Sequence, residues 1–358
     1  MGRRRTELLA ATVLLTGCTV AGSPSPEHRD EPQVFTVQAT VDLPTATPYP
    51  GYEGASAAAV GDDGSLTVLL PGAPSLLLRD GAAPLTLPAL VPGTTRVIGQ
   101  PDGSTLVTGL GDAGPLAVRV DPAGAVAAPV VLPGDPAGVV PDGPDVLLLT
   151  PNGGGVDLAR ADAATGQPTG SGRVDLPGQG AVGPVALAVA PDGSLRLLAN
   201  RGDGIADGTA TLVTLDAAFV ETGRVVASTS AQPGSFFALD VDAAGTAWVV
   251  VGQRLPGTDT ALLEVRPGDT QPRRVTALAA EVVDVAVTPD GERVHLLGRV
   301  DGLPGDVATL DTTAGRFLGS TDVCRDARSS MAASPDRAVL VVLGDCGYGE
   351  GPQAAVLR

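Results

Sequence analysis

Hydrophobic and polar residues follow one pattern most clearly in residues 282–323. Val283, Val285 and Val287 alternate with smaller or more polar residues, which is typical of a β-strand. A Pro-Asp-Gly turn follows at 289–291, and after it come an apolar strand, a polar loop, a third strand, a turn at 311–315 and a fourth strand. The pattern predicts one four-stranded antiparallel unit.

The same order of strands and turns recurs along the chain. An alternating strand precedes each first turn, and a nearly continuous apolar strand, typical of burial on both faces, follows it. Asp and Gly favour these turns because they tolerate left-handed backbone conformations. Successive turns are 39, 40, 50, 52, 46 and 46 residues apart. The seven turns lie at Asp63-Gly64, Asp102-Gly103, Asp142-Gly143, Asp192-Gly193, Ala244-Gly245, Asp290-Gly291 and Asp336-Arg337.

Seven four-stranded units at this spacing predict an all-β fold, a seven-bladed β-propeller of four-stranded antiparallel blades over residues 34–358. The last repeat, residues 329–358, has room for only three strands. Residues 34–43 form a strand without a partner nearby in sequence, so we expect this N-terminal strand to close the last blade. A pair of β-sandwiches is the alternative, which the sevenfold period disfavours. A closed ring leaves few edges exposed, so we expect a monomer.

Composition fits a core made of many thin layers, because aromatic residues are only 3% of the chain. The 48 Gly and 32 Pro residues fall between the Val- and Leu-rich runs, where they punctuate strands. The formal net charge of −17 argues against a nucleic-acid partner, since such binding needs a basic surface.

Residues 1–18 have the form of a signal peptide, with an arginine cluster, an apolar run and small residues before Cys18. The ending Leu15-Thr16-Gly17-Cys18 resembles the lipobox of bacterial lipoproteins. The resemblance implies lipidation at Cys18 and a place on the extracytoplasmic side of the cell membrane. Residues 19–33, rich in Pro, Ser and charge, predict a flexible tether of about 20 Å as a coil and up to roughly 45 Å when extended. An ordinary secretory signal with a chance cysteine and an uncleaved anchor are the alternatives.

Two repeats carry a further resemblance. The runs 289–315 and 191–216, with Leu197-Leu-Ala-Asn200 inside the second, resemble the YVTN-type repeats of bacterial seven-bladed propellers. The turn at 162–166 stands where that family has its Asp-rich turn. Propellers of this kind include ligand sensors, protein-docking scaffolds and some lactonases. The resemblance therefore leaves open a binding or scaffolding lipoprotein and, as the alternative, a lactonase-type hydrolase using loop carboxylates.

Catalytic and cofactor motifs give weak signals. The two histidines are His28, in the tether, and His295, which we interpret as a packed, hydrogen-bonded core residue. The run GLGDAG at 109–114 fits a dinucleotide-binding motif but leads into another strand rather than a helix. The loop from Asp203 to Asp207 lacks the closing Glu of a calcium loop, so a solvated loop is the better interpretation. Trp248 is interpreted as a plug in the core between blades. We predict no catalytic residues, no cofactor and no metal site.

Three successive blades place an arginine eight or nine residues after the turn glycine, at Arg201, Arg254 and Arg299. Equivalent positions lie side by side around a propeller, so the three guanidiniums are expected to converge on one rim. Arginine suits carboxylate or phosphate groups, which makes these residues candidates for a small anionic ligand. Asp203 and Asp301 follow their arginines by two residues and either orient them or merely neutralise them. The other candidate partner is a protein of the cell envelope.

Two further cysteines remain once Cys18 is used for lipidation. Cys324 lies at the end of the outer strand of the sixth blade, and Cys346 lies after the second strand of the seventh. In a propeller both places are on the same rim, and the predicted compartment is oxidising, so we expect a Cys324–Cys346 disulfide. Two reduced, buried thiols are the alternative.

Overall fold

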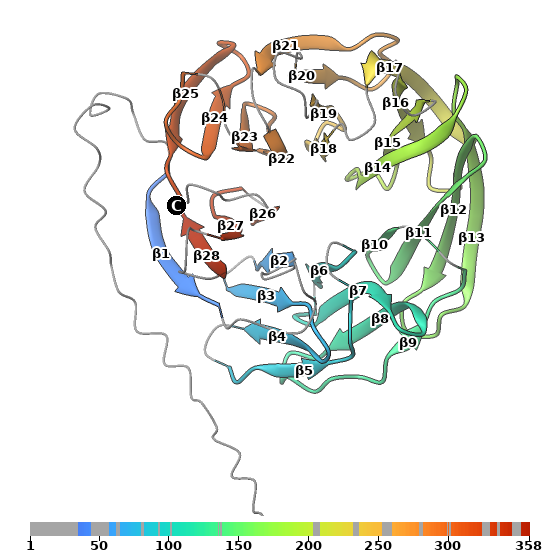
Figure 1. Ribbon diagram of the computed structural model, residues 1–358, viewed down its shortest axis with the longest axis vertical. Helices are drawn as coiled ribbons and strands as arrows, with labels where there is room; N and C mark the ends of the chain where they lie inside the picture. Colours follow the sequence, from blue (N-terminus) through green and yellow to red (C-terminus); the bar gives the residue numbers. More distant parts are fainter. Residues whose placement is uncertain are drawn as a thin grey trace, which may run out of the picture.

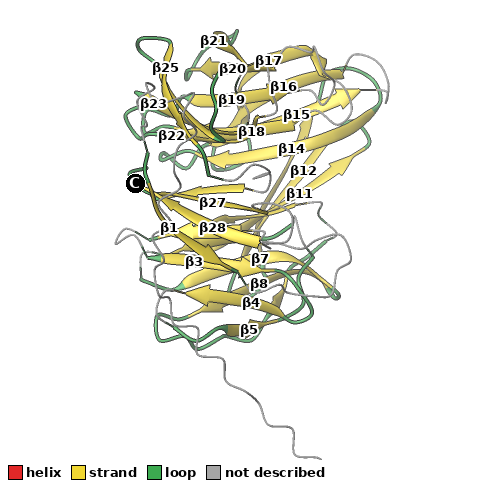
Figure 2. Cartoon of the chain, turned by 60° about the vertical axis from the view of Figure 1, so that its left-hand side comes forward, coloured by secondary structure: helices red, strands yellow, loops and turns green. Residues whose placement is uncertain are grey.

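A computed structural model describes residues 35–43, 57–61, 65–79, 82–91, 94–100, 102–134, 136, 138–202, 208–231, 236–252, 260–278, 282–298, 300, 302–323, 330–334, 337–345 and 352–358. Its regular elements are all β-strands, as Figure 2 shows, and this confirms the all-β prediction. Within these residues, no helix has the length and apolar character needed to cross a membrane.

The strands form seven four-stranded antiparallel sheets that surround a centre like the blades of a propeller (Figure 1). Blade 1 contains β2 (Ala57–Val60), β3 (Leu66–Leu70), β4 (Ser75–Arg79) and β5 (Leu85–Leu87). Blade 2 contains β6 (Arg96–Gly99), β7 (Thr105–Gly111), β8 (Gly114–Val120) and β9 (Val130–Val131). Blade 3 contains β10 (Gly138–Asp142), β11 (Asp145–Asn152), β12 (Gly155–Asp162) and β13 (Pro168–Asp175). Blade 4 contains β14 (Ala181–Val189), β15 (Leu195–Gly202), β16 (Gly208–Leu215) and β17 (Glu221–Ala231).

Blade 5 contains β18 (Phe236–Val241), β19 (Ala247–Gly252), β20 (Thr260–Val265) and β21 (Arg273–Leu278). Blade 6 contains β22 (Val282–Val287), β23 (Arg293–Gly298), β24 (Val307–Asp311) and β25 (Arg316–Thr321). Blade 7 contains β26 (Ser330–Ala333), β27 (Leu340–Asp345), β28 (Pro352–Leu357) and β1 (Val37–Asp42). In each blade the first strand named is the innermost (Figure 1).

The N-terminal strand closes the ring, as the sequence predicts. Strand β1 pairs antiparallel with β28 as the outermost strand of blade 7, so this blade joins both ends of the described chain. Thr36 and Arg358 also exchange two backbone hydrogen bonds, of 2.7 and 3.1 Å. The two ends of the ring therefore meet at its outer wall (Figure 1).

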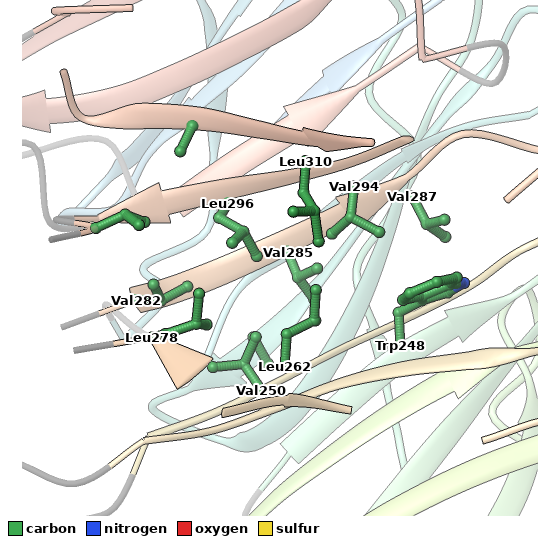
Figure 3. Close-up of a cluster of buried hydrophobic side chains, with 13 residues drawn as sticks. Trp248, Val250, Leu262, Leu278, Val282, Val285, Val287, Val294, Leu296 and Leu310 are labelled. Carbon is green, nitrogen blue, oxygen red and sulfur yellow. The ribbon is translucent and has the colours of Figure 1, made fainter. Parts of the chain in front are cut away.

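The core is divided among the interfaces between blades. Seven clusters of buried apolar side chains each combine residues of two neighbouring blades. Second strands contribute most, because most residues of β7, β15 and β19 are buried, as their continuous apolar sequences predict. Trp248, 3% exposed, belongs to the cluster between blades 5 and 6 (Figure 3), which confirms its interpretation as an inter-blade plug.

The predicted turns between first and second strands are confirmed where the structure describes them. Gly103, Gly143, Gly193, Gly245 and Gly291 all have positive φ, which suits glycine because it lacks a Cβ. In blade 7 the same place is taken by Arg337, with φ of 59°. A non-glycine residue at this angle is uncommon and needs support from its surroundings. Gly64 lies outside the described residues.

The outermost strands are poorly suited to pairing with another chain. In blades 3 to 7 the register of the outermost pair shifts at a bulge or irregularity. The outermost strands of blades 1 and 2 have only three and two residues. Bulges and short edges both hinder addition of a further strand.

Candidate functional site

The centre of the ring is accessible to solvent. None of the four residues of β6 is buried, and those of β26 are all only partly buried, in contrast to the second strands behind them. Innermost strands have one edge without a neighbouring strand, so their backbone amides need other acceptors. The centre therefore presents polar backbone as well as small side chains.

Two carboxylates provide such acceptors in blades 5 to 7. Asp240 of β18 accepts the N–H of Val241 (2.9 Å) and, across the interface, the N–H of Val287 in β22 (2.9 Å). Asp284 of β22 does the same one blade further, with the N–H of its neighbour Val285 (2.9 Å) and that of Met331 in β26 (2.8 Å). Each carboxylate thus ties its own innermost strand to that of the next blade.

Arg337 of blade 7 also binds Asp240. Its Nη2 lies 3.0 Å from Oδ2 of Asp240, and the two side chains are 22% and 20% exposed. Its Nε donates to the carbonyl of Val287 at 3.1 Å, and its Nη1 to that of Ser334 at 3.1 Å. Because these groups belong to blades 5, 6 and 7, one side chain links three blades. These contacts are the support that holds the left-handed backbone of Arg337.

Asp284 differs from Asp240 because none of the ion pairs found among the described residues includes it. Part of its surface reaches solvent in the centre, yet protein atoms surround the carboxyl group, and this desolvation raises its pKa to about 6. Its two backbone hydrogen bonds lower the pKa, repulsion from Asp240 raises it further, and attraction by Arg96 of β6 lowers it. Arg96 itself is exposed, and its Nη1 donates to the carbonyl of Thr95 at 2.8 Å.

Most acidic residues at the hairpin turns serve the turns themselves. Four of these acids accept hydrogen bonds from backbone N–H groups two or three residues further on, namely Asp102, Asp162, Asp192 and Asp290. In each case a nearby Ser or Thr hydroxyl also donates to the carboxylate, and these bonds hold the pKa of the four carboxyl groups below its usual value. These acids are therefore turn caps, ionised at neutral pH.

Among the predicted rim residues, the structure describes Arg201 alone. Its Nη1 donates to the carbonyl of Leu176 at 2.5 Å and its Nε to that of Gly180 at 3.3 Å, so it binds the connection between blades 3 and 4. Arg254, Arg299, Asp203 and Asp301 lie outside the described residues, and so does the Asp203–Asp207 loop. Convergence of the three arginines stays a prediction. Cys18, Cys324 and Cys346 also lie outside the described residues.

His295 is a core residue, as its interpretation from the sequence has it. It is 2% exposed on β23, its Nδ1 lies 3.0 Å from the Oγ1 of Thr309, and its ring meets that of Phe35 edge-on at 4.8 Å. Burial lowers the pKa of His295 to about 4, helped by the positive charges of Arg293 and Arg337. Its Nε2 has no hydrogen-bond partner among the described residues.

Other motifs resolve into ordinary structure. The run 109–114 forms the hairpin between β7 and β8, so it does not open a helix as a dinucleotide site requires. Among the described residues, no three His, Cys, Asp or Glu side chains gather closely enough to hold a metal ion. A shallow hollow of about 530 Å³ on blade 3 is lined by Thr150, Asp157, Leu158, Ala159, Ser171, Gly172 and Arg173.

Sequence reasoning missed Asp240, Asp284, Arg337 and Arg96. A signal existed for two of them, because Asp284 and Arg96 both stand seven residues before a turn glycine, at positions where other blades have small residues. Aligning the blades on their turns would have exposed these departures. Nothing in the sequence indicated that Arg337 reaches two blades back to Asp240.

The described chain is thus a seven-bladed β-propeller, and comparisons of structure agree. A chain of the mitotic checkpoint complex matches with a TM-score of 0.57 and 15% identity, over 90% of this chain and 94% of the other. Hydrazine synthase of Kuenenia stuttgartiensis matches with a TM-score of 0.56 and 14% identity, over 88% and 97%. An oligogalacturonate lyase in complex with manganese matches with a TM-score of 0.57 and 13% identity, over 84% and 88%. At these identities the likeness shows the fold alone.

Comparisons of sequence add no family. A scan against protein-family models finds no match, and a search of curated proteins finds none either.

Proposed function

We propose that the protein is a membrane-anchored, extracytoplasmic β-propeller lipoprotein that binds or scaffolds a partner, either an envelope protein or a small anionic ligand. One observation carries this proposal. Three residues separate the predicted tether from β1, and β1 is the outermost strand of the closing blade. An anchor at Cys18 would therefore hold the ring by its outer wall and leave the loops and the centre free for a partner (Figure 1).

Several charged side chains are already bound in structural contacts, which supports a binding role over a catalytic one. Asp240 and Arg337 tie blades together, and the turn acids cap their own hairpins. Loop carboxylates bound in this way serve structure, whereas hydrolysis needs two groups placed together for proton transfer. The bulged or short outer strands further support a monomeric ring, which sedimentation or light scattering of the protein without its signal peptide tests directly.

The anchor is tested by replacing the lipidation residue. In Cys18→Ser, the protein is expected to leave the membrane fraction or to accumulate as a precursor that retains residues 1–17, because no thiol remains to be acylated. Ser23→Ala, in the same predicted tether, is the matched control and should partition like the parent. Unchanged membrane partition and unchanged mass in Cys18→Ser would overturn the anchor.

Partner binding is tested by capture from the cell envelope with the anchored protein as bait. The expected result is one or a few proteins or ligands retained by the intact ring and lost when deletion of residues 34–43 opens blade 7. Recovery of the same species on the opened ring, or of none on the intact ring, would contradict the scaffold function.

A second candidate is the propeller hydrolase, and Asp284 is the observation that favours it. A carboxyl group with a pKa of about 6 can act as a general acid or base near neutral pH. One structural neighbour is an oligogalacturonate lyase, so lactones and oligogalacturonides are the substrates to assay. Turnover that disappears in Asp284→Ser at equal stability would establish catalysis, whereas no turnover by the parent would leave the binding function in place.

A further inference from the structure

Equivalent positions in the blades can be counted from the turn between the first two strands. In five blades the turn residue donates its N–H to the carbonyl three residues earlier. These turn residues are Gly103, Gly193, Gly245, Gly291 and Arg337, with bonds of 2.8 to 3.0 Å. Shared turn geometry means that an equal count back along the innermost strand reaches the same level in each blade.

Seven residues before the turn residue, the five blades carry Arg96, Ala186, Ala238, Asp284 and Ser330. Three of the five are small, as expected where the innermost strands of neighbouring blades approach one another. The two others are a cation and an anion at the same level. Large charged side chains at a position otherwise held by Ala or Ser depart from the repeat, and such departures are expected at functional or strained sites.

Arg96 and Asp284 lie on innermost strands of opposite sides of the ring. They belong to blades 2 and 6, and Figure 1 shows β6 and β22 on opposite sides of the ring. The positive charge of Arg96 lowers the pKa of the Asp284 carboxyl group, so the two charges interact. Yet the two do not form an ion pair within 4 Å, since neither belongs to any of the salt bridges of the described residues.

Neither Arg96 nor Asp284 uses all of its hydrogen-bonding capacity in the contacts described. The guanidinium of Arg96 donates one hydrogen bond, to Thr95, although it carries five N–H donors. Each oxygen of Asp284 accepts one backbone N–H and keeps a free lone pair. The charged groups around Asp284 are Arg96 on β6, which attracts it, and Asp240 on β18, which repels it and is already neutralised by Arg337. A ligand cation would compensate Asp284, and a ligand anion would compensate Arg96.

We propose that the centre of the ring, between Arg96 and Asp284, binds a small zwitterion, namely a free amino acid or a short peptide. Arg96 holds the ligand carboxylate through its planar fork of donors, and Asp284 holds the ammonium group. The equivalent positions of blades 4, 5 and 7 carry small side chains. This ligand class deepens the proposed binding function and rests on it.

The test is isothermal titration calorimetry of the protein from residue 19 onward with L-alanine, L-alanyl-L-alanine and L-alanyl-L-alanyl-L-alanine. Acetate and methylammonium, which carry one charge each, are the ligand controls. Arg96→Ala and Asp284→Ser place in each blade a residue that another blade already has, so both variants should fold. Arg119→Ala is the matched control, because its pair with Asp102 lies on the surface, with the side chains 53% and 56% exposed.

The expected result is binding of at least one zwitterion, weakened tenfold or more in Arg96→Ala and in Asp284→Ser and unchanged in Arg119→Ala. Below pH 6 the carboxyl group of Asp284 becomes neutral, so the affinity of the parent should fall about tenfold between pH 7 and 5. The affinity of Asp284→Ser should not change over that interval. A purely structural Asp284 would not produce this pH dependence of binding.

Three outcomes would overturn the proposal. No zwitterion binds with a Kd of about 1 mM or lower, which is roughly 4 kcal/mol of binding free energy; acetate binds as tightly as the zwitterions; or Arg96→Ala binds like the parent. Membrane partition of Cys18→Ser and envelope capture are read separately. A ring that captures an envelope protein without binding zwitterions therefore retains its proposed function and loses only this ligand.

Discussion

Two desolvated groups, His295 and Asp284, should give the protein opposite responses to acid that nearly cancel. The pKa of His295 falls from 6.5 to about 4 on folding, so the unfolded chain binds its proton more tightly. Stability from His295 is therefore complete above pH 6.5 and is lost as pH falls toward 4. The pKa of Asp284 rises from 3.8 to about 6, so the folded chain binds that proton more tightly. Its effect has the other sign, and stability increases as pH falls from 6 toward 3.8.

The magnitudes follow from the pKa values. As pH falls from 7 to 4.5, protonation of His295 should lower the unfolding free energy by roughly 2 kcal/mol, and protonation of Asp284 should raise it by roughly 2 kcal/mol. The turn acids do not interfere, because their pKa values lie below 3.8 in the folded protein and they stay ionised in this interval. The parent should therefore change little in stability between pH 7 and 4.5.

Single substitutions separate the two contributions. His295→Gln removes the titrating ring, so the unfolding free energy should rise by roughly 2 kcal/mol as pH falls from 7 to 4.5, whatever the substitution costs at pH 7. Asp284→Ser should show a fall of similar size. Urea unfolding at each pH, followed by fluorescence of Trp248, measures both, because this single tryptophan is 3% exposed in the core.

His28→Gln is the matched control. It removes the second histidine of the chain, which lies in the predicted tether, and should leave the pH profile of the parent unchanged. If His295→Gln follows the parent profile within about 0.5 kcal/mol over this interval, the burial of a neutral imidazole does not carry the linkage, and the reasoning fails.

The remaining predictions concern packing and covalent links. Phe35→Ala should lower the unfolding free energy by about 3 kcal/mol, since Phe35 is 6% exposed between blades 6 and 7, whereas Val37→Ala, at 37% exposure, should cost less than about 0.5 kcal/mol by the same urea unfolding. Gly155→Ala should destabilise by roughly 1–3 kcal/mol, because the new Cβ would overlap the carbonyl oxygen of Val174, and an unchanged urea midpoint would refute the overlap. The Cys324–Cys346 disulfide should leave no reactive thiol from this pair in the unfolded, unreduced protein and should contribute about 3 kcal/mol; two labelled thiols would exclude it.

Regular repetition made the fold predictable from sequence. An Asp-Gly turn fixes where one strand ends and the next begins, and the apolar strand after it predicts burial on both faces. Together they determined the number of blades, the place of Trp248 and the closing role of β1, and the structure confirms all three. Arg337 is the exception that shows the limit, because its left-handed backbone depends on contacts with Asp240 and Val287, which are distant in sequence.

The candidate site was harder to predict because its charged residues are far apart in the sequence and interact only in the folded ring. Arg201 fits the sequence pattern of a rim cation, but its guanidinium donates to two backbone carbonyls that only the folded connection between blades 3 and 4 brings near it. Asp284 looked like the polar position of an alternating strand. Its environment depends on Met331 of the next blade and on Arg96 across the centre, neither of which strand periodicity can place.

The blades of a propeller can, however, be compared with one another, because each blade packs against its neighbours in the same way. Where three of the five compared blades agree on a small residue, packing sets the choice, and a charge at that position costs desolvation that packing does not require. The carboxyl group of Asp284 is desolvated in this way, as its raised pKa shows. Arg96 lies on the opposite side of the ring at the same level, and its guanidinium uses one of its N–H donors, in the bond to Thr95. Asp240 lies two residues further along its strand, and its ion pair with Arg337 offsets the cost of desolvating it. Its role is therefore structural. Among the described residues of the centre, folding alone therefore does not account for Arg96 and Asp284.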